Sequence, residues 1–287
     1  MATGTTEFVD STTADVFIPE IWSQGAIVTR EQRLVFAKLV DRRYEKDLKY
    51  GDIINVPTID NLAARSKAKA TNAAITYEAL TETNTQITVA TWEYSAMAVE
   101  SIVEVQANRD LFKAYAGKMG YALDLAVDDV LAGLPDDATN AVGALAVGLT
   151  YDDLLRARQY LDDANAPVDD RYIVVAPAEE ANLMKLDHFI NRDYSALVGG
   201  STRDPDRGWF GTWLGMPVYK STNVEGSNAA GHDNAMFHRE AYALVIQMKP
   251  KAHHMYDIDY FVDKVAIEQL YGTQTMRNAH GVFMRGA

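Results

Sequence analysis

Any metal or catalytic site in this chain must be built from its six histidines and 40 carboxylates, because the chain contains no cysteine. The lack of cysteine excludes disulfides, thiolate metal sites, iron–sulfur clusters and cysteine nucleophiles. The strongest metal candidate is the group His253, His254, Asp257 and Asp259. On a strand, His253, Asp257 and Asp259 would share a face, but a rise of ~3.3 Å per residue spreads them too far for one small cation. We therefore interpret these side chains as solvent-exposed strand residues.

Two acidic pairs, Asp128-Asp129 and Asp136-Asp137, could serve acid catalysis or calcium binding. Neither pair lies in the alternating pattern of oxygen ligands that a calcium loop requires, so we interpret both as solvated surface. The chain also lacks the spacings of a phosphate-binding loop, a dinucleotide fingerprint, a His-Glu-x-x-His zinc motif and a Gly-x-Ser-x-Gly nucleophile turn. We expect no catalytic residue, no cofactor and no metal.

Length, charge and hydropathy place the chain among folded, acidic proteins. Its 287 residues carry 27 Lys and Arg against 40 Asp and Glu, a net charge of −13, and 48% are hydrophobic. That balance excludes a generally basic nucleic-acid binder and a disordered chain. No stretch approaches the ~20 apolar residues of a membrane span, and the N-terminus lacks a basic region followed by an apolar core. We expect no membrane partner and no export from the compartment of synthesis.

The first hundred residues predict an arm followed by a long hairpin. Residues 1–16 show no helical or strand period, and large apolar side chains follow at Phe17, Ile18 and Trp22. A helical spacing at residues 34–39 must meet the body or another subunit. Strands are predicted at residues 53–59 and 86–99, the second with a phase slip near Ala90 that indicates a bulge or bend. The connection between them is too long for a compact domain, so we interpret it as a projecting two-stranded hairpin whose outer part needs a partner.

The rest of the chain mixes helices and strands. Spacings of three and four predict a helix over residues 101–134, longer than a typical globular helix, which would serve as a strut. A second helix at 151–164 begins after the N-cap Thr150, residues 172–176 predict a buried strand, and Pro177 opens a third helix. Residues 136–148 predict a linker and residues 197–215 an exposed loop. Further strands are predicted at 216–220 and 235–237, both at sheet edges, and at 242–248, 255–262, 265–270 and 281–284, with a turn at Tyr271 and Gly272.

Charge is distributed unevenly along the chain. Between Lys118 and Arg156 there are acidic residues and no basic one: Asp124, Asp128, Asp129, Asp136, Asp137, Asp152 and Asp153. The predicted hairpin has the opposite character, with Arg65, Lys67 and Lys69 and no acid between Asn61 and Tyr77. The two segments could attract one another, or both could be surfaces that only interact with water.

The order of these features, together with several short segments, resembles a known family over essentially the whole chain. The segments are FIPEIW at 17–22, GDIINVP at 51–57, YIVVAP at 172–177, GMPVYKS at 215–221 and YGT at 271–273. They are similar to segments of the major capsid protein of tailed bacteriophages. The resemblance implies an α+β protein with the Hong Kong 97-like fold, which combines an N-terminal arm, an extended β-hairpin loop, a long spine helix and an α/β axial domain.

The resemblance also implies how the chain is divided. The arm would take residues 1–43 and the extended loop residues 44–99. The peripheral domain, with the spine helix, would take 100–138 and 235–270, and the axial domain 139–234 and 271–287. In such proteins the extended loop lies over a neighbour's peripheral domain, and axial domains meet around fivefold and sixfold axes. The expected function is therefore that of a non-enzymatic subunit whose pentamers and hexamers form an icosahedral shell around double-stranded DNA.

Three groups of residues are expected to contact other copies: the arm residues Phe17, Ile18 and Trp22, the loop residues Arg65, Lys67 and Lys69, and the spine residues Asp124, Asp128 and Asp129. The chain has no room for a scaffolding segment before the arm, so a separate scaffolding protein is expected, together with a portal. Packaged DNA would be held without sequence-specific contact, because strong phosphate contacts would retard packaging and ejection. The particle would be assembled in the host cytoplasm and the protein would reside in the virion.

Two alternatives remain open from the sequence. The same fold is used by encapsulin-like bacterial compartments, which store an enzyme rather than a genome. A more remote alternative is a soluble hydrolase with a carboxylate site at the C-terminal strands. Protein cargo inside purified particles would favour the first, and a monomer with a closed pocket would favour the second.

Overall fold

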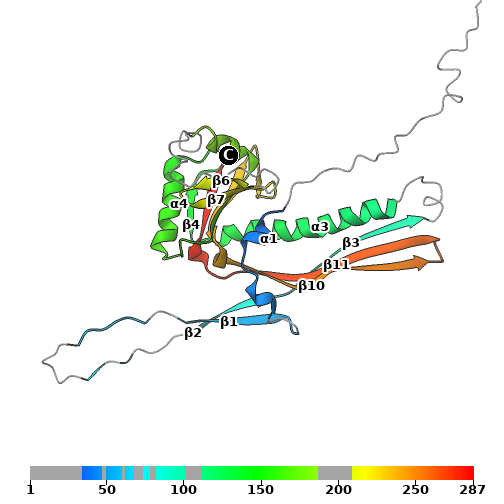
Figure 1. Cartoon of the computed structure of the whole chain (residues 1–287), viewed down its shortest axis with the longest axis horizontal. Helices are drawn as coiled ribbons and strands as arrows, with labels where there is room; N and C mark the ends of the chain where they lie inside the picture. Colours follow the sequence, from blue (N-terminus) through cyan, green and yellow to red (C-terminus); the bar gives the residue numbers. More distant parts are fainter. Residues whose placement is uncertain are drawn as a thin grey trace, which may run out of the picture. The chain divides into compact units, whose positions relative to one another are not determined.

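A computed structural model describes residues 34–46, 50–59, 62–67, 74, 75, 77, 82–100, 111–186 and 209–287. These residues form three β-sheets and a set of helices (Figure 1). The helices are α1 (Phe36–Leu39), α3 (Leu111–Gly133), α4 (Tyr151–Asp163) and α5 (Pro177–Leu183), and 3₁₀ turns occur at Arg43–Lys46, Leu134–Asp137, Arg239–Ala241 and Asn278–His280. No helix among the described residues is long and apolar enough to cross a membrane.

The predicted hairpin is present at its base. Strand β1 (Ile53–Ile59) pairs antiparallel with β2 (Glu82–Thr88), from Ile53 opposite Thr88 to Ile59 opposite Glu82. The described part of the connection, residues 62–67, has neither helix nor strand and is exposed. The predicted strand at 86–99 is interrupted near Ala90, as its phase slip indicated, because β2 and β3 (Thr91–Glu100) belong to different sheets.

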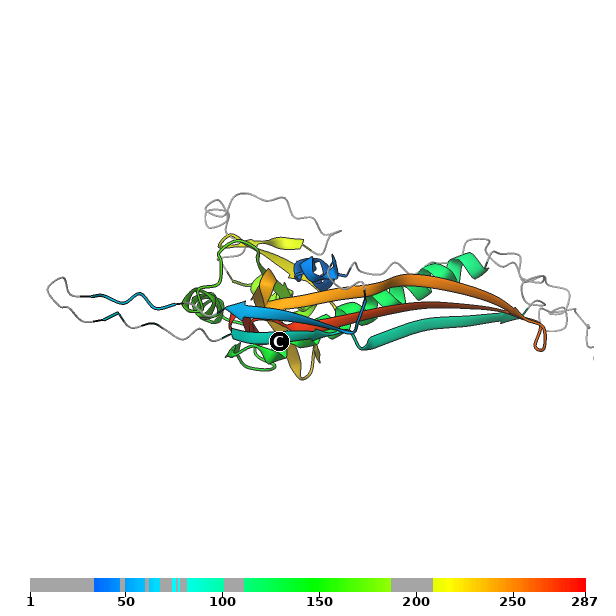
Figure 2. The same ribbon diagram turned by 90° about the horizontal axis from the view of Figure 1, so that it is seen from below.

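A three-stranded sheet has the order β10-β11-β3, with β10 at Tyr242–Asp257 and β11 at Val262–Thr275 (Figure 2). The prediction of three shorter strands at 242–248, 255–262 and 265–270 was wrong. Two long strands, β10 and β11, take their place, and residues 255–262 contain the turn between them. The predicted turn at Tyr271 and Gly272 was also wrong. Gly272 lies within β11, where a Cβ would collide with the carbonyl oxygen of Thr88, so glycine serves close strand packing there rather than a turn.

Helix α3 covers one face of this sheet. Gln269 of β11 donates a side-chain hydrogen bond to the carbonyl oxygen of Leu123 on α3, at 2.9 Å. Residues of β3 alternate between partly covered and exposed, as expected for a sheet with one face packed and the other free. The described helix has 23 residues, about 35 Å at ~1.5 Å per residue. The first part of the predicted helix, residues 101–110, lies outside the described residues.

A second sheet of seven strands has the order β4-β12-β9-β5-β7-β6, with β8 beside β9. Its strands are β4 (Asn140–Gly143), β5 (Arg171–Val175), β6 (Trp209–Trp213), β7 (Met216–Lys220), β8 (Gly226–Ser227), β9 (Gly231–His238) and β12 (Gly281–Gly286). The prediction that β7 and β9 are edge strands was wrong, since each lies between two others. The predicted linker at 136–148 contains strand β4, and the predicted exposed loop at 197–215 contains strand β6. Their sequences are too short and too rich in glycine or polar residues to show a strand pattern.

The seven-stranded sheet separates two hydrophobic cores. Ala235 and Phe237 of β9 point into one core, which also contains Leu131 of α3, and Met236 points into the other, which contains Leu154 of α4. Val35, just before α1, and Phe36 and Leu39 of α1 belong to the first core. The segment with the predicted helical spacing, residues 34–39, therefore packs against the body of its own subunit. Thr150 caps α4 as predicted.

Candidate functional site

The histidine and aspartate group on β10 does not converge on a metal ion. His253 Nε2 lies 2.9 Å from Glu268 Oε1, and His254 Nε2 lies 3.2 Å from Asp263 Oδ1 on the opposite face of the sheet. Asp259 lies in the turn after β10. Both histidine side chains are more than half exposed, which confirms the prediction of solvent-exposed strand residues for them. The contacts are cross-strand pairs between β10 and β11.

Asp128 is not on the solvated surface, so that prediction was wrong for this residue. Its side chain is completely buried on α3. Oδ1 accepts a hydrogen bond from the backbone N–H of Ala37 at 3.2 Å, and Oδ2 accepts one from Asn223 Nδ2 at 3.0 Å. Burial raises the pKa of the Asp128 carboxyl, and these hydrogen bonds oppose the rise. Asp128 is therefore an internal anchor of the subunit and is unavailable to a neighbouring copy.

The other two predicted spine residues, Asp124 and Asp129, are exposed. Desolvation raises the pKa of the Asp124 carboxyl. Asp129 borders a hollow of about 620 Å³ between α3 and the segment that precedes β8. We call this hollow the spine groove; it is lined by Ala122, Leu125, Ala126 and Asp129 of α3 and by residues 222–226.

A cluster of three carboxylates lies beside the spine groove. Asp136, Glu225 and Asp233 each place an oxygen within 4.8 Å of the others. Desolvation raises the pKa of both Glu225 and Asp233, and the neighbouring charge of Asp136 raises each further. Sequence reasoning missed Glu225 and Asp233, because only the pairing of β8 with β9 brings them together, and no local pattern signals that pairing.

The predicted basic contact residues are described in part. Arg65 and Lys67 are exposed on the loop between β1 and β2. Lys69 and the arm residues Phe17, Ile18 and Trp22 lie outside the described residues. Within the described parts, the structure does not bring the loop cations together with Asp124 or Asp129, so any contact between them must form between copies.

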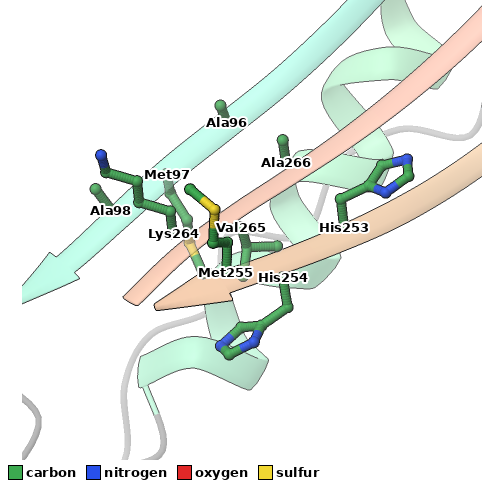
Figure 3. Close-up of a pocket in the computed structure, with 9 residues that line it drawn as sticks. All are labelled: Ala96, Met97, Ala98, His253, His254, Met255, Lys264, Val265 and Ala266. Atoms are coloured by element: carbon green, nitrogen blue, oxygen red, sulfur yellow. The ribbon is translucent and has the colours of Figure 1, made fainter. Parts of the chain in front are cut away.

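The face of the three-stranded sheet opposite α3 carries a hollow of about 520 Å³ (Figure 3). Ala96, Ala98 and Ala266 line this hollow, and Figure 3 shows Ala96 and Ala266 pointing to the side opposite His254. Farther along β3, Trp92 and Tyr94 on the same face are 68% and 74% exposed. Exposed aromatic side chains next to a bare stretch of sheet are typical of a surface that contacts another protein.

A second apolar surface lies at the turn between β10 and β11. Ile258, Tyr260 and Phe261 expose 72%, 73% and 64% of their surfaces. These three large side chains lie at the end of a hairpin and remain mostly exposed, although Lys264 Nζ lies 5.6 Å from the centre of the Tyr260 ring. They are typical of a contact with another protein.

Comparison with known proteins identifies the family. The model of the family described as phage capsid protein matches residues 82–267. The chain belongs to the phage capsid protein family. This capsid protein is a structural component of a virion, and its copies associate with one another into a shell. The match is to phage capsids rather than to bacterial compartments, and it excludes the hydrolase alternative.

Solved structures with the same fold come from several phages. The structure titled Mycobacterium phage Che8 shares 24% identity, covers 93% of this chain and 97% of that chain, and has a TM-score of 0.77. A capsid structure of the Cyanophage P-SCSP1u shares 18% identity, with coverages of 99% and 95% and a TM-score of 0.75. The structure titled Gordonia phage Cozz shares 13% identity, with coverages of 100% and 97% and a TM-score of 0.73. No curated protein sequence matches the chain. The predicted Hong Kong 97-like fold is thereby confirmed.

Proposed function

We propose that copies of this capsid protein form pentamers and hexamers that close into an icosahedral shell around the double-stranded DNA of a tailed phage. The observation that carries the proposal is the hairpin of β1 and β2, whose described loop, residues 62–67, is exposed and extended and contributes nothing to the subunit's own core. Such a segment can bury its surface only when a neighbouring copy lies beneath it. Contacts divided among several neighbours can each be weak while the closed shell is stable.

In this proposal the subunit has four parts: an arm at residues 1–43, an extended loop, a peripheral domain and an axial domain. The peripheral domain is built on α3 and the three-stranded sheet, and the axial domain on the seven-stranded sheet. We assign β3 to the peripheral domain, because it pairs with β11 along its whole length. The extended loop then occupies about residues 44–90.

The contacts between copies involve the loop, the spine and the arm. Arg65, Lys67 and Lys69 approach the acidic flank of a neighbour's α3, which presents Asp124 and Asp129. The apolar arm residues Phe17, Ile18 and Trp22 occupy a groove of another copy. Asp128 is omitted from this set because its carboxylate is buried and hydrogen-bonded within its own subunit.

The further partners in this proposal are a separate scaffolding protein, a portal and the packaged DNA, with assembly in the host cytoplasm. A net charge of −13 supports an inner surface that binds DNA weakly. A protein that neutralises many phosphates would bind the DNA tightly and would slow both packaging and ejection.

Electron microscopy of the expressed protein tests the proposal. We expect closed particles of uniform diameter, alone or with the phage's scaffolding protein, and a fast-sedimenting species in the ultracentrifuge. A monodisperse monomer under both conditions would refute shell formation. Particles that enclose a specific protein cargo, and that package no DNA with the other phage proteins present, would refute the genome container.

A further inference from the structure

Two buried histidines lie where the chain passes between its two larger sheets. The 3₁₀ turn η5 (Arg239–Ala241) connects β9 of the seven-stranded sheet to β10 of the three-stranded sheet, and η6 (Asn278–His280) connects β11 back to β12. We call these two turns the sheet junction. His238 immediately precedes η5 and His280 ends η6, and the two residues are 5% and 7% exposed. Their rings meet edge to face with centroids 6.0 Å apart, so the pair belongs to the sheet junction.

Backbone hydrogen bonds join the two turns. The carbonyl oxygen of Ala241 accepts hydrogen bonds from the N–H groups of Met276 and Arg277, at 2.8 and 3.2 Å. The carbonyl oxygen of Asn278 accepts one at 3.3 Å from the N–H group of Thr139, in the segment that leads from α3 to β4. Because these bonds link segments that are distant in the sequence, a change at the sheet junction affects how the two sheets are joined.

A backbone hydrogen bond requires His238 to be neutral. Its Nδ1 accepts this bond from the N–H group of Glu240 at 3.2 Å, so the ring caps the start of η5. A neutral imidazole has one acceptor nitrogen, whereas a protonated imidazole has two N–H donors and no acceptor. A proton on Nδ1 would face a second donor, and the bond would break. Protonation of His238 is therefore incompatible with the observed geometry of η5.

His280 has no acceptor for a second proton. Its ring is hydrogen-bonded to the backbone of Ala164, at the end of α4. Its Nδ1 is buried and has no hydrogen-bond partner within the described parts of the chain. A protonated Nδ1 would be a buried donor without an acceptor, which is destabilising. Protonation of both rings would also bring two positive charges together inside the sheet junction.

The neighbouring charges do not reverse the effect of burial. Two carboxylates and two guanidinium groups act on the pair: Glu240, Asp170, Arg171 and Arg277. The carboxylates favour protonation and the guanidinium groups disfavour it. Glu240 is itself paired with Arg43 at 3.1 Å. Burial is the largest influence on both rings, and the pKa of each is lowered.

We propose that His238 and His280 form a pH-sensitive switch, which keeps the sheet junction closed while both rings are neutral and opens it when they take up protons. In an open junction each ring reaches water and takes up a proton near pH ~6.5, as an unperturbed histidine does. In the closed junction the rings stay neutral at that pH. A falling pH therefore favours the open form. The switch lies within one subunit, so it does not depend on the proposed shell.

Hydrogen–deuterium exchange of the whole chain tests the switch. Between about pH 7.5 and about pH 5.5 an exposed ring with a pKa of about 6.5 takes up most of a proton, so each histidine can increase local opening by as much as about tenfold. After correction for the intrinsic pH dependence of exchange, we expect the amides of residues 239–241 and 276–281 to lose protection in acid while those of α3 keep theirs. Unchanged protection at the sheet junction, or an equal loss in α3, would overturn the proposal.

A double variant that cannot take up these protons isolates the pair. His238→Asn retains a side-chain acceptor for the N–H group of Glu240, and His280→Gln retains an N–H donor. We expect the double variant to keep the sheet junction protected at about pH 5.5. His253→Gln, at an exposed position on β10, is the matched control and should lose protection as wild type does. A double variant that opens in acid as much as wild type would overturn the proposal.

The single variant His238→Asn keeps the test decisive if the double variant does not fold. Melting at about pH 7.5 checks the folding of each variant. With one titrating ring left in the sheet junction, the acid-induced loss of protection should be smaller than that of wild type by as much as about tenfold. A loss equal to that of wild type would show that His238 takes no part in the switch and would overturn the paired mechanism.

Discussion

The carboxylate of Asp128 on α3 accepts a hydrogen bond from the backbone N–H of Ala37, which lies 91 positions earlier in the chain. This bond ties α1, in the last part of the proposed arm, to the helix on which the proposed peripheral domain is built. Helix α1 has no side-chain cap of its own, and its first backbone N–H groups would otherwise be buried without an acceptor. Asp128 thus supplies from a distant helix what an N-cap residue normally supplies locally.

We expect Asp128→Ala to lower the free energy of unfolding by about 2–4 kcal/mol, because the N–H groups of Ala37 and Asn223 both lose their acceptor in a buried site. Asp128→Asn retains one carbonyl oxygen and should cost less. Chemical denaturation monitored by circular dichroism measures both changes.

Asp129→Ala is the matched control for this experiment. Asp129 is the next residue on the same helix but is exposed, so its removal should change the free energy of unfolding by less than about 0.5 kcal/mol. Equal effects of the two alanine substitutions would contradict the role of Asp128 as an anchor.

Glu179 provides a second buried carboxylate that joins distant segments. Oε1 accepts a hydrogen bond from the N–H of Leu149 at 2.9 Å, and Oε2 accepts one from the N–H of Ala287 at 2.8 Å. We expect Glu179→Ala to lower the free energy of unfolding by about 2–4 kcal/mol, because two backbone donors are left unsatisfied. Denaturant titration gives the value.

The neighbouring Glu180 distinguishes burial from charge. Its carboxylate pairs with Lys220 at 3.0 Å in a partly exposed position, so Glu180→Ala should cost about 0–1 kcal/mol. A larger loss for Glu180 than for Glu179 would refute the importance of the buried hydrogen bonds.

Much of the local structure could be predicted from the sequence because local chemistry determines it. Thr150 and Pro177 begin α4 and α5 as expected, and strand β1 has the predicted bounds. The phase slip at Ala90 correctly marked the point where the chain leaves one sheet for another. Sheet position could not be predicted, since β7 is interior only because β6 adds to it from a segment that reads as a loop.

The candidate site was less predictable than the fold. Asp128 and Asp129 are adjacent in sequence, and nothing local shows that one faces the core and the other the solvent. Glu225 and Asp233 join Asp136 only through the pairing of distant segments. Carboxylate positions on the helix could therefore be predicted, but the burial of each carboxylate and the convergence of three of them depend on tertiary packing.

His280 should make the stability of the subunit depend on pH. It is buried and in edge contact with the ring of His238, at 6.0 Å between centroids. Burial lowers the pKa of His280, and the charges of Arg277 and His238 lower it further. The unfolded chain therefore takes up a proton near pH ~6.5 while the folded chain does not, so this contribution to stability is present above that pH and lost as the pH falls through the lowered pKa.

Comparing wild type with His280→Gln isolates this effect. Asp128 and Glu179 act in the opposite sense, because their raised pKa values give a contribution that is present at low pH and lost as the pH rises through the folded-state pKa. Both proteins contain these carboxylates, so they cancel in the comparison. On going from about pH 7.5 to about pH 5.5, the melting temperature of wild type should change less favourably than that of His280→Gln. Parallel pH profiles would show that His280 contributes nothing.

Deletion of the arm should separate folding from assembly. Removing residues 1–22 takes away Phe17, Ile18 and Trp22 but keeps the buried Val35 and Phe36, which pack in the first core. We expect a folded protein whose melting temperature changes by less than about 2 °C, with shells much reduced in number in electron micrographs. Removing residues 1–16 alone keeps all three apolar side chains and is the matched control, which should assemble normally. Normal particles from the longer deletion would show that these side chains are dispensable, and loss of particles from the shorter one would move the contact to the polar part of the arm.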